Sequence, residues 1–264
     1  MGDLNGQPVL RLVGISKRFG AVQALTEVDL ELHRGEVVAL IGDNGAGKST
    51  LAKVIAGVAP ADSGEIRMDG PRVAVHDPSQ AQRLGIASVY QDLALCDNLD
   101  VVANLFLGAE EGTAGVLDGI DMERRARVLL DELSVRIPDV HVPVASLSGG
   151  QRQSVAIARC LLGDPKVVIL DEPTAALGVT QTAHVLDLIE RMRDRDLAVI
   201  LISHNLADVR AVADRAVVLR LGRNAGDYPV AHTSQRDIVA AITGASSGPG
   251  PALHRSRPQR VPTR

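Results

Sequence analysis

The sequence predicts an α/β fold with a parallel sheet as its core, an antiparallel β subdomain at the N-terminus and an inserted helical subdomain. Three observations predict this fold. Short, almost wholly apolar runs are typical of strands that helices bury on both faces, and they occur at residues 37–41, 167–170 and 198–202. Apolar and polar residues alternate over residues 9–15 and 25–32, as in strands with one solvated face. Between about residues 92 and 147, apolar residues follow helical spacing instead.

After the first apolar run, a glycine-rich loop leads into a predicted helix over residues 48–56. We expect Gly57 to end this helix, because glycine readily adopts the left-handed conformation found just after helices. Further short strands are predicted at residues 64–68, 72–75 and 86–90.

The helical subdomain is predicted to span about residues 92–165. Its clearest helix follows Asp121, a residue type that often caps a helix N-terminus. Before that helix, residues 108–119 form a loose, acidic interruption. The apolar stripe of the helix consists of Met122, Ala126, Leu129, Leu130 and Leu133.

The remainder of the chain returns to alternating helices and strands. Helices are predicted at residues 180–195, 205–213 and 234–243, and strands at residues 198–202, 215–221 and 224–228. Gly, Pro, Ser and Arg dominate beyond this point, so residues 244–264 are predicted to form a disordered tail. The folded domain is therefore predicted to span residues 9–243.

Composition and charge narrow the function classes. The hydrophobic content of 45% and charged content of 23% are those of a soluble globular protein. A net charge of -4 argues against a nucleic-acid partner, which usually demands a basic face. The apolar runs are far shorter than the ~18–20 residues that span a bilayer, and no signal peptide is recognisable. Cys96 and Cys160 show no metal spacing and are interpreted as small hydrophobes, so we expect a cytoplasmic protein that reaches a membrane only through a partner.

The glycine-rich loop matches the phosphate-binding pattern G-x-x-x-x-G-K-[ST], in the required context between a strand and a helix. Its residues are Gly42, Asp43, Asn44, Gly45, Ala46, Gly47, Lys48 and Ser49, followed by Thr50. Glycines let successive backbone N–H groups surround phosphate oxygens, and the helix N-terminus adds its positive dipole end. Lys48 is expected to reach the β- and γ-phosphates, and the Ser49 hydroxyl to bind Mg²⁺. The alternative is a simple glycine-rich turn.

Two acids end the apolar run at residues 167–170. We expect Asp171 to hold Mg²⁺, directly or through water. Glu172 could polarise a water that attacks the γ-phosphate, which is the work of a general base. A strand ending in Asp-Glu is common and often only structural, but a phosphate-binding loop in the same chain favours the functional interpretation.

The most specific signal is Leu147-Ser148-Gly149-Gly150-Gln151. Ser148 and Gln151 have the spacing of a capping box that opens a helix. The two glycines leave bare N–H groups at that helix start, which could meet a γ-phosphate. With this pentapeptide the chain resembles the ATP-binding-cassette (ABC) family, whose signature it is. We refer to residues 147–151 as the signature.

The resemblance covers about residues 9–243 and implies a P-loop NTPase core that binds and hydrolyses ATP with Mg²⁺. It implies that Phe19 stacks on adenine, that Gln91 touches Mg²⁺ and reports nucleotide state to a membrane subunit, and that His204 contacts the γ-phosphate. Glu172, His204, Lys48 and Gln91 are therefore the expected catalytic residues. In the family, two cassettes pack head to tail, and each signature completes the site of its partner.

Residues 84–92 and 98–108 resemble the ribose- and xylose-type sugar importers of this family. The turn Ala175-Ala176-Leu177-Gly178 also looks like that branch, although the wider family places Asp where Gly178 stands. The resemblance implies a motor subunit at the cytoplasmic face of the membrane, bound to permease subunits and working indirectly with a sugar-binding protein. The single set of motifs implies a second ATPase copy, most simply a homodimer.

Two alternatives stay open at this point. The chain could be a soluble ABC ATPase that acts on DNA or ribosomes, although it has neither a long insertion between loop and signature nor a basic linker between fused cassettes. It could also be a degraded, non-hydrolysing scaffold, against which the intact Lys48, Asp171, Glu172 and His204 argue. The sequence leaves open which sugar is carried and what the tail does.

Overall fold

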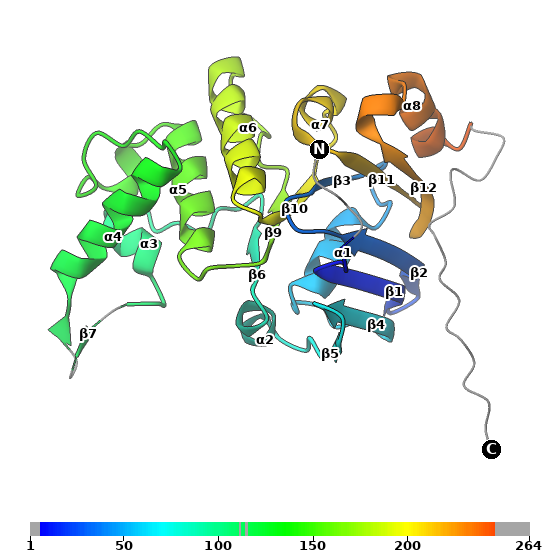
Figure 1. Cartoon of the computed structure of the whole chain (residues 1–264), viewed down its shortest axis with the longest axis horizontal. Helices are drawn as coiled ribbons and strands as arrows, with labels where there is room; N and C mark the ends of the chain where they lie inside the picture. The colour runs from blue at the N-terminus through cyan, green and yellow to red at the C-terminus, as the bar shows by residue number, and fades with distance from the viewer. Residues whose placement is uncertain (1–5, 111, 114–115, 246–264) are drawn as a thin grey trace.

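The computed structural model describes residues 6–110, 112–113 and 116–245, so the predicted tail lies outside the described residues from residue 246 onward. Two sheets dominate the molecule (Figure 1): a four-stranded sheet in the order β2-β1-β4-β5 and a six-stranded sheet in the order β12-β11-β3-β10-β9-β6. This arrangement confirms the predicted α/β class with an antiparallel β subdomain. Among the described helices, none combines the length and the apolar character needed to cross a membrane.

The four-stranded sheet is antiparallel and comprises β1 (Leu10–Phe19), β2 (Val22–Leu32), β4 (Ser63–Met68) and β5 (Arg72–Val73). β1 and β2 are longer than predicted because they continue into a hairpin whose turn contains Gly20, at φ +56°. Their outer ends are exposed, so the alternation of apolar residues fades there although pairing persists. β5 is shorter than predicted.

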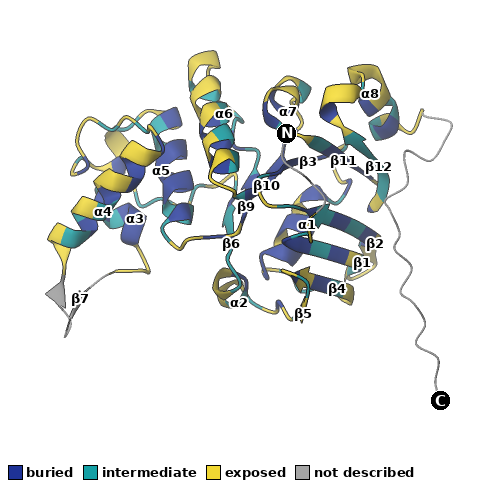
Figure 2. Ribbon diagram, viewed as in Figure 1, coloured by how far each residue is buried: buried dark blue, intermediate teal, exposed yellow. Residues whose placement is uncertain are grey.

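The six-stranded sheet forms the core. β3 (Val37–Ile41) and β10 (Ala198–Ile202) are buried at every residue, as Figure 2 shows, which confirms the interpretation of their apolar runs. β3, β10, β9 and β6 run parallel, and β11 also runs parallel to β3, so the carboxyl ends of these strands meet at one edge. β12 is the antiparallel edge strand. The remaining bounds are β6 (Ile86–Val89), β9 (Val167–Asp171), β11 (Arg215–Arg220) and β12 (Arg223–Pro229).

Helices cover the sheets and build the insertion. Their bounds are α1 (Lys48–Ile55), α2 (Pro78–Arg83), α3 (Val101–Phe106), α4 (Gly119–Glu132), α5 (Gly149–Leu161), α6 (Val179–Asp194), α7 (Leu206–Val212) and α8 (Gln235–Thr243). Short elements complete the description: strands β7 (Gly112–Thr113) and β8 (Val116–Leu117) and the 3₁₀ helices Val144–Ser146 and Val230–His232. Sequence reasoning missed α2, which is too short to show a period. Its start was readable, because Asp77 caps it by accepting a bond from Gln80 N at 2.8 Å and Pro78 occupies its first position.

α3, α4 and α5 form the helical subdomain, which lies at one end of the molecule, away from the antiparallel sheet (Figure 1). Their apolar faces share one core, to which Phe106, Met122, Leu130 and Val155 belong. The predicted N-cap at Asp121 is wrong. Asp118 caps α4 instead, accepting a bond from Asp121 N at 3.0 Å, and α4 begins at Gly119. Residues 92–100 are irregular rather than helical, since they are held by side chains instead of a helical ladder.

Candidate nucleotide-binding site

The glycine-rich loop connects β3 to α1, and its conformation depends on glycine. Gly42 has φ +152°, and a Cβ there would lie 2.2 Å from the carbonyl oxygen of Leu219. Gly47 has φ +106°, and a Cβ there would lie 2.9 Å from the carbonyl oxygen of Ala24. α1 begins directly after Gly47, and no side chain caps its first N–H groups. Such a helix start suits an anion.

Lys48 is buried inside this loop, with 8% of its surface exposed. Its Nζ donates to the carbonyl oxygens of Gly42, at 2.8 Å, and Asp43, at 3.0 Å. The ammonium group is therefore held within the concave side of the loop by neutral acceptors. Phosphate oxygens would be stronger acceptors for the same charge, so the loop fits the phosphates of a nucleotide.

Asp171 lies at the carboxyl end of β9 and accepts a hydrogen bond from the Ser49 hydroxyl. Burial raises the pKa of the Asp171 carboxyl, and the charge of adjacent Glu172 raises it further. The bond from Ser49 and the charges of Lys48 and Lys53 oppose this rise. A hydroxyl and a carboxylate that needs a compensating cation are ligands that suit Mg²⁺, so these two residues fit the predicted ion.

Glu172 and His204 meet at the ends of two adjacent parallel strands, β9 and β10. His204 Nδ1 lies 2.7 Å from Glu172 Oε2. Glu172 has a left-handed backbone, φ +52°, and its N–H donates to Ile202 O at 2.9 Å. The Glu172 side chain is mostly buried, whereas 71% of the His204 side chain is exposed. The imidazole therefore orients a shielded carboxylate while its exposed edge remains open to a ligand.

Two other predicted residues lie near the surface. Gln91 is exposed and follows β6, which runs parallel to β9, so it lies at the same sheet edge as Asp171. Phe19 ends β1 with 48% of its surface exposed, and Lys17 Nζ lies 5.5 Å from its ring centroid. A half-exposed ring offers a stacking face, but Phe19 belongs to the antiparallel sheet rather than to the edge that carries the other residues.

The signature opens α5 as predicted. Gln151 N donates to Ser148 Oγ at 3.3 Å and Ser148 N donates to Gln151 Oε1 at 3.0 Å, so the capping box is present. Figure 1 shows α5 and α1 on opposite sides of β6 and β9. Within one chain, the signature helix therefore lies apart from the glycine-rich loop.

Sequence reasoning missed two supporting residues. Asp208 is buried and accepts bonds from Thr174 Oγ1 at 2.7 Å and Asn205 Nδ2 at 3.0 Å, which ties the turn after Glu172 to the turn after His204. Gln181 accepts a bond from Gly178 N at 3.2 Å. Atoms of its side chain also lie 3.0 Å from the position of a Cβ at Gly150. The contacts from Asp208 to Asn205 and from Gln181 to Gly178 join residues three positions apart at helix starts, a spacing that could have been found in the sequence, whereas the Thr174–Asp208 bond is long-range and leaves no local signal.

Comparisons with known proteins agree with this geometry. A family model described as "ABC transporter" matches residues 25–175. The fructose import ATP-binding protein of Rhizobium meliloti is 45% identical over 260 residues, covering 94% of this chain and 98% of that protein. The xylose/arabinose import ATP-binding protein of Sulfolobus acidocaldarius is 41% identical over 240 residues, covering 91% and 96%. A dimeric ATP-binding cassette solved in a post-hydrolysis state with ADP and Pi has a TM-score of 0.71 and 25% identity, covering 84% of this chain and 98% of that chain.

Proposed function

Since this chain belongs to the ATP-binding-cassette family of ABC transporters, we propose that it is the ATP-hydrolysing motor of an importer that carries a monosaccharide. The observation that carries the proposal is the match, over nearly their whole length, to two relatives named as import ATP-binding proteins for fructose and for xylose or arabinose. The same similarity argues against a soluble ATPase acting on DNA or ribosomes. In this role the chain is a peripheral subunit at the cytoplasmic face of the membrane.

ATP phosphates bind in the loop over residues 42–49. Lys48 Nζ exchanges its carbonyl partners for β- and γ-phosphate oxygens, which are charged and form stronger hydrogen bonds with the buried ammonium group. Phe19 offers its exposed face to the adenine. Ser49 and Asp171, with Gln91, would hold Mg²⁺, which supplies positive charge that neutralises the phosphates.

Glu172 acts as the general base on the attacking water. His204 holds the Glu172 carboxylate in place through the 2.7 Å contact and presents its exposed edge to the γ-phosphate. Because the kinked backbone at Glu172 is anchored to Ile202 O, the carboxylate is positioned before the nucleotide arrives. Such preorganisation avoids rearrangement during the reaction.

Two copies form the working unit. In each copy the signature helix lies apart from the loop, so Ser148 and the N–H groups of Gly149 and Gly150 complete the site of the partner copy. A head-to-tail dimer with a two-fold axis places two such composite sites in one interface. ATP holds the copies together, and hydrolysis releases them, because ATP and ADP differ in affinity for the closed state.

Permease subunits receive this movement through residues 91–104. A groove of about 470 Å³ borders this region, lined in part by Tyr90, Phe106 and Cys160. The Tyr90 hydroxyl is buried there without a hydrogen-bond partner in the described structure, so a docking segment could supply one. A sugar-binding protein acts on the permease and does not touch this chain.

Reconstitution with its permease tests the proposal. The protein is purified from native membranes with its partners, placed in liposomes and screened for ATP turnover with sugar-loaded binding protein. We expect slow turnover alone and faster turnover with one monosaccharide, and Glu172→Gln protein serves as the inactive control. Recovery with DNA or ribosomes and no permease would contradict the importer role. Recovery with a permease that ignores every sugar would remove only the substrate class.

A further inference from the structure

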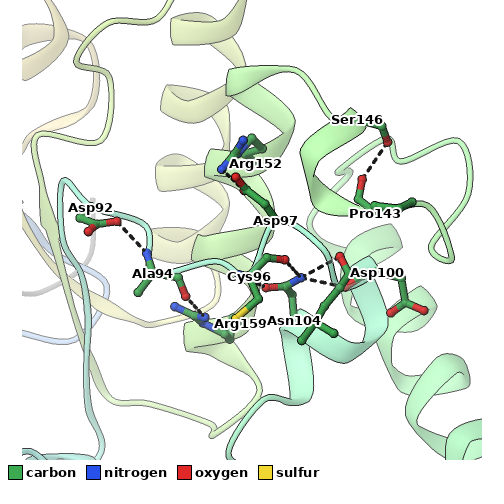
Figure 3. A network of polar contacts seen from close by, with 11 residues as sticks. Asp92, Ala94, Cys96, Asp97, Asp100, Asn104, Pro143, Ser146, Arg152 and Arg159 are labelled. Atoms are coloured by element: carbon green, nitrogen blue, oxygen red, sulfur yellow. Dashed lines mark hydrogen bonds and ion pairs between the residues drawn. The ribbon is translucent and has the colours of Figure 1, made fainter.

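Arg159 of the signature helix fastens the irregular segment just after Gln91 to that helix (Figure 3). Arg159 of α5 donates from Nη1 to the carbonyl oxygen of Ala94 at 2.8 Å, as Figure 3 shows. It also donates from Nη2 to the carbonyl oxygen of Leu93 at 2.9 Å. A guanidinium group with two acceptors holds both position and orientation, since its donors are fixed in one plane. We call residues 92–97 the tethered segment.

The tethered segment contains a backbone conformation that alanine rarely adopts. Ala94 has φ +49°, in the left-handed region, and its N–H donates to Asp92 Oδ1 at 3.2 Å. A residue with a Cβ is unfavourable in this region unless its surroundings enforce it. The carbonyl groups gripped by Arg159 flank this kink, so the bond that fastens the segment also helps to enforce its shape.

Two further contacts make the segment and its continuation a single rigid piece. Arg152, on the first turn of α5, pairs with Asp97. Asn104 is fully buried; it accepts a bond from Cys96 N at 2.7 Å and donates to carbonyl oxygens of Cys96, Leu99 and Asp100 at 2.9–3.1 Å. These bonds close the turn that leads from the tethered segment into α3.

The signature helix is suited to carry movement along its axis. Its 13 residues extend for about 20 Å. Ser148 caps its N-terminal end, and most of the helix packs into a hydrophobic core that the helical subdomain shares with one face of the six-stranded sheet and with α6. Arg152 and Arg159 are seven residues apart, so they lie on one face, two turns from each other. Both ends of this helical face are thus attached to the tethered segment.

We propose that Arg159, assisted by Arg152, is a positioning residue that makes the tethered segment and the signature helix move as one body. A displacement of residues 92–97 is thereby delivered to Ser148 rather than absorbed by a flexible loop. The inference rests on the proposed function for what displaces the segment and for what Ser148 binds, while the link itself rests on the contacts of Arg159. Coupling of this kind works in both directions, so engagement of Ser148 also reaches residues 92–97.

Hydrogen exchange with mass spectrometry tests the link without a permease. Glu172→Gln protein is measured with and without ATP and Mg²⁺, in otherwise native protein and with Arg159→Ala, Arg159→Lys or Arg127→Ala added. Arg127 is the matched control, because it forms an exposed ion pair with Glu123 on α4 of the same subdomain. Without ATP, Arg159→Ala should speed hydrogen exchange of residues 92–97 by about tenfold or more. The exchange rates of residues 149–161 should stay within about twofold of those in the parent protein. Arg127→Ala should change neither segment.

The response to ATP separates a link from a merely structural role. In the parent protein, ATP should slow exchange both at the start of α5 and in residues 92–97. In Arg159→Ala protein only α5 should respond. Arg159→Lys should restore part of the response, because it keeps the positive charge and one donor nitrogen. Glycine adopts the left-handed conformation of residue 94 without strain. Combining Ala94→Gly with Arg159→Ala therefore tests whether the backbone shape of the segment is enough for residues 92–97 to respond to ATP. We expect the response of residues 92–97 to stay lost in that double variant.

Four outcomes separate failure of the Arg159 link from failure of the proposed function. A response of residues 92–97 that survives Arg159→Ala overturns the assignment of the link to Arg159, as does a response restored by Ala94→Gly. A parent protein in which α5 responds to ATP and residues 92–97 do not also contradicts the link and leaves the proposed function standing. A parent protein in which neither segment responds contradicts the ATP-dependent dimer itself, and the inference falls with it.

Discussion

Glu172 and His204 are joined by a 2.7 Å contact, so their proposed roles as base and orienting group can be separated by substitution. Glu172→Gln keeps the shape of the side chain and removes its basicity. We expect ATP still to bind and turnover to fall by ~10²–10⁴, with an ATP-stabilised dimer accumulating. Steady-state turnover and size-exclusion chromatography with ATP measure both effects, and near-normal turnover would place the base elsewhere.

The ionised carboxyl group of Asp171 destabilises the folded protein. Its pKa is raised in the native protein, mainly by burial and next by the charge of Glu172. An acid whose pKa is higher folded than unfolded destabilises the fold once it ionises, so its favourable contribution is complete below the unfolded pKa and is lost as pH rises through the folded pKa. Asp171→Asn should therefore raise the Tm of nucleotide-free protein at pH 7 more than at pH 4, while turnover is lost. A larger gain at pH 4 would contradict this cause.

The predictability of the site depended on whether its residues are adjacent in sequence. Lys48, Ser49, Asp171 and the signature lie in short contiguous motifs, and the structure places them at helix starts and strand ends as their patterns indicate. The role of Asp208 in joining two turns was not predicted, because its bond to Thr174 joins residues 34 positions apart. Long-range side-chain pairs of this kind leave no periodic or motif signal.

The start of α6 is the element in which this chain departs from the usual family pattern. Gly178 occupies its N-cap position with φ -74° and ψ 165°, a conformation open to any residue, and no side chain caps the helix. Gly178→Asp should fit without strain and stabilise the helix by a few tenths of a kcal/mol. Because Gln181 connects this turn to Gly150, we expect the cooperativity of ATP hydrolysis to change more than ATP affinity.

Hill coefficients and nucleotide affinity, measured for both proteins, decide this point. Gly178→Asn is a useful control, since it supplies a similar cap without the charge. An unchanged Hill coefficient with altered affinity would mean that residue 178 acts only on its own site.

At the scale of elements, long buried strands were predicted more accurately than short or irregular segments. β3 and β10 have the predicted bounds because every residue in them is buried. Residues 92–100 were expected to be helical, but they are irregular. Asp100, at the end of this segment, is half-buried. Its side chain caps α3 by accepting a hydrogen bond from Ala103 N at 2.7 Å.

The whole molecule is predicted to form a head-to-tail dimer in which each ATP site contains residues of both copies. Mixing two variants that are each defective in one half of the site tests this prediction. A heterodimer of Lys48→Ala and Ser148→Arg chains contains one intact composite site and one doubly damaged site. We therefore expect the mixture to bind ATP and form ATP-dependent dimers beyond the sum of the two variants alone. Light scattering and nucleotide-binding measurements check this.

The matched control pairs Ser148→Arg chains with chains carrying both substitutions, because no combination of those two restores a site. If the first mixture behaves like this control, each chain completes its own site and the head-to-tail arrangement is wrong.

The position of β3 at the centre of the six-stranded sheet has a consequence for how the protein is made. β3, near residue 37, pairs with β10 and β11, which begin only at Ala198 and Arg215. Gly222, after β11, also donates to Ala46 O at 3.0 Å inside the glycine-rich loop. On the ribosome, the phosphate loop is thus synthesised early but lacks its supports until some 175 further residues have emerged. Nascent chains arrested before β11 should be digested equally fast by protease with and without ATP, whereas released full-length chains should gain protection.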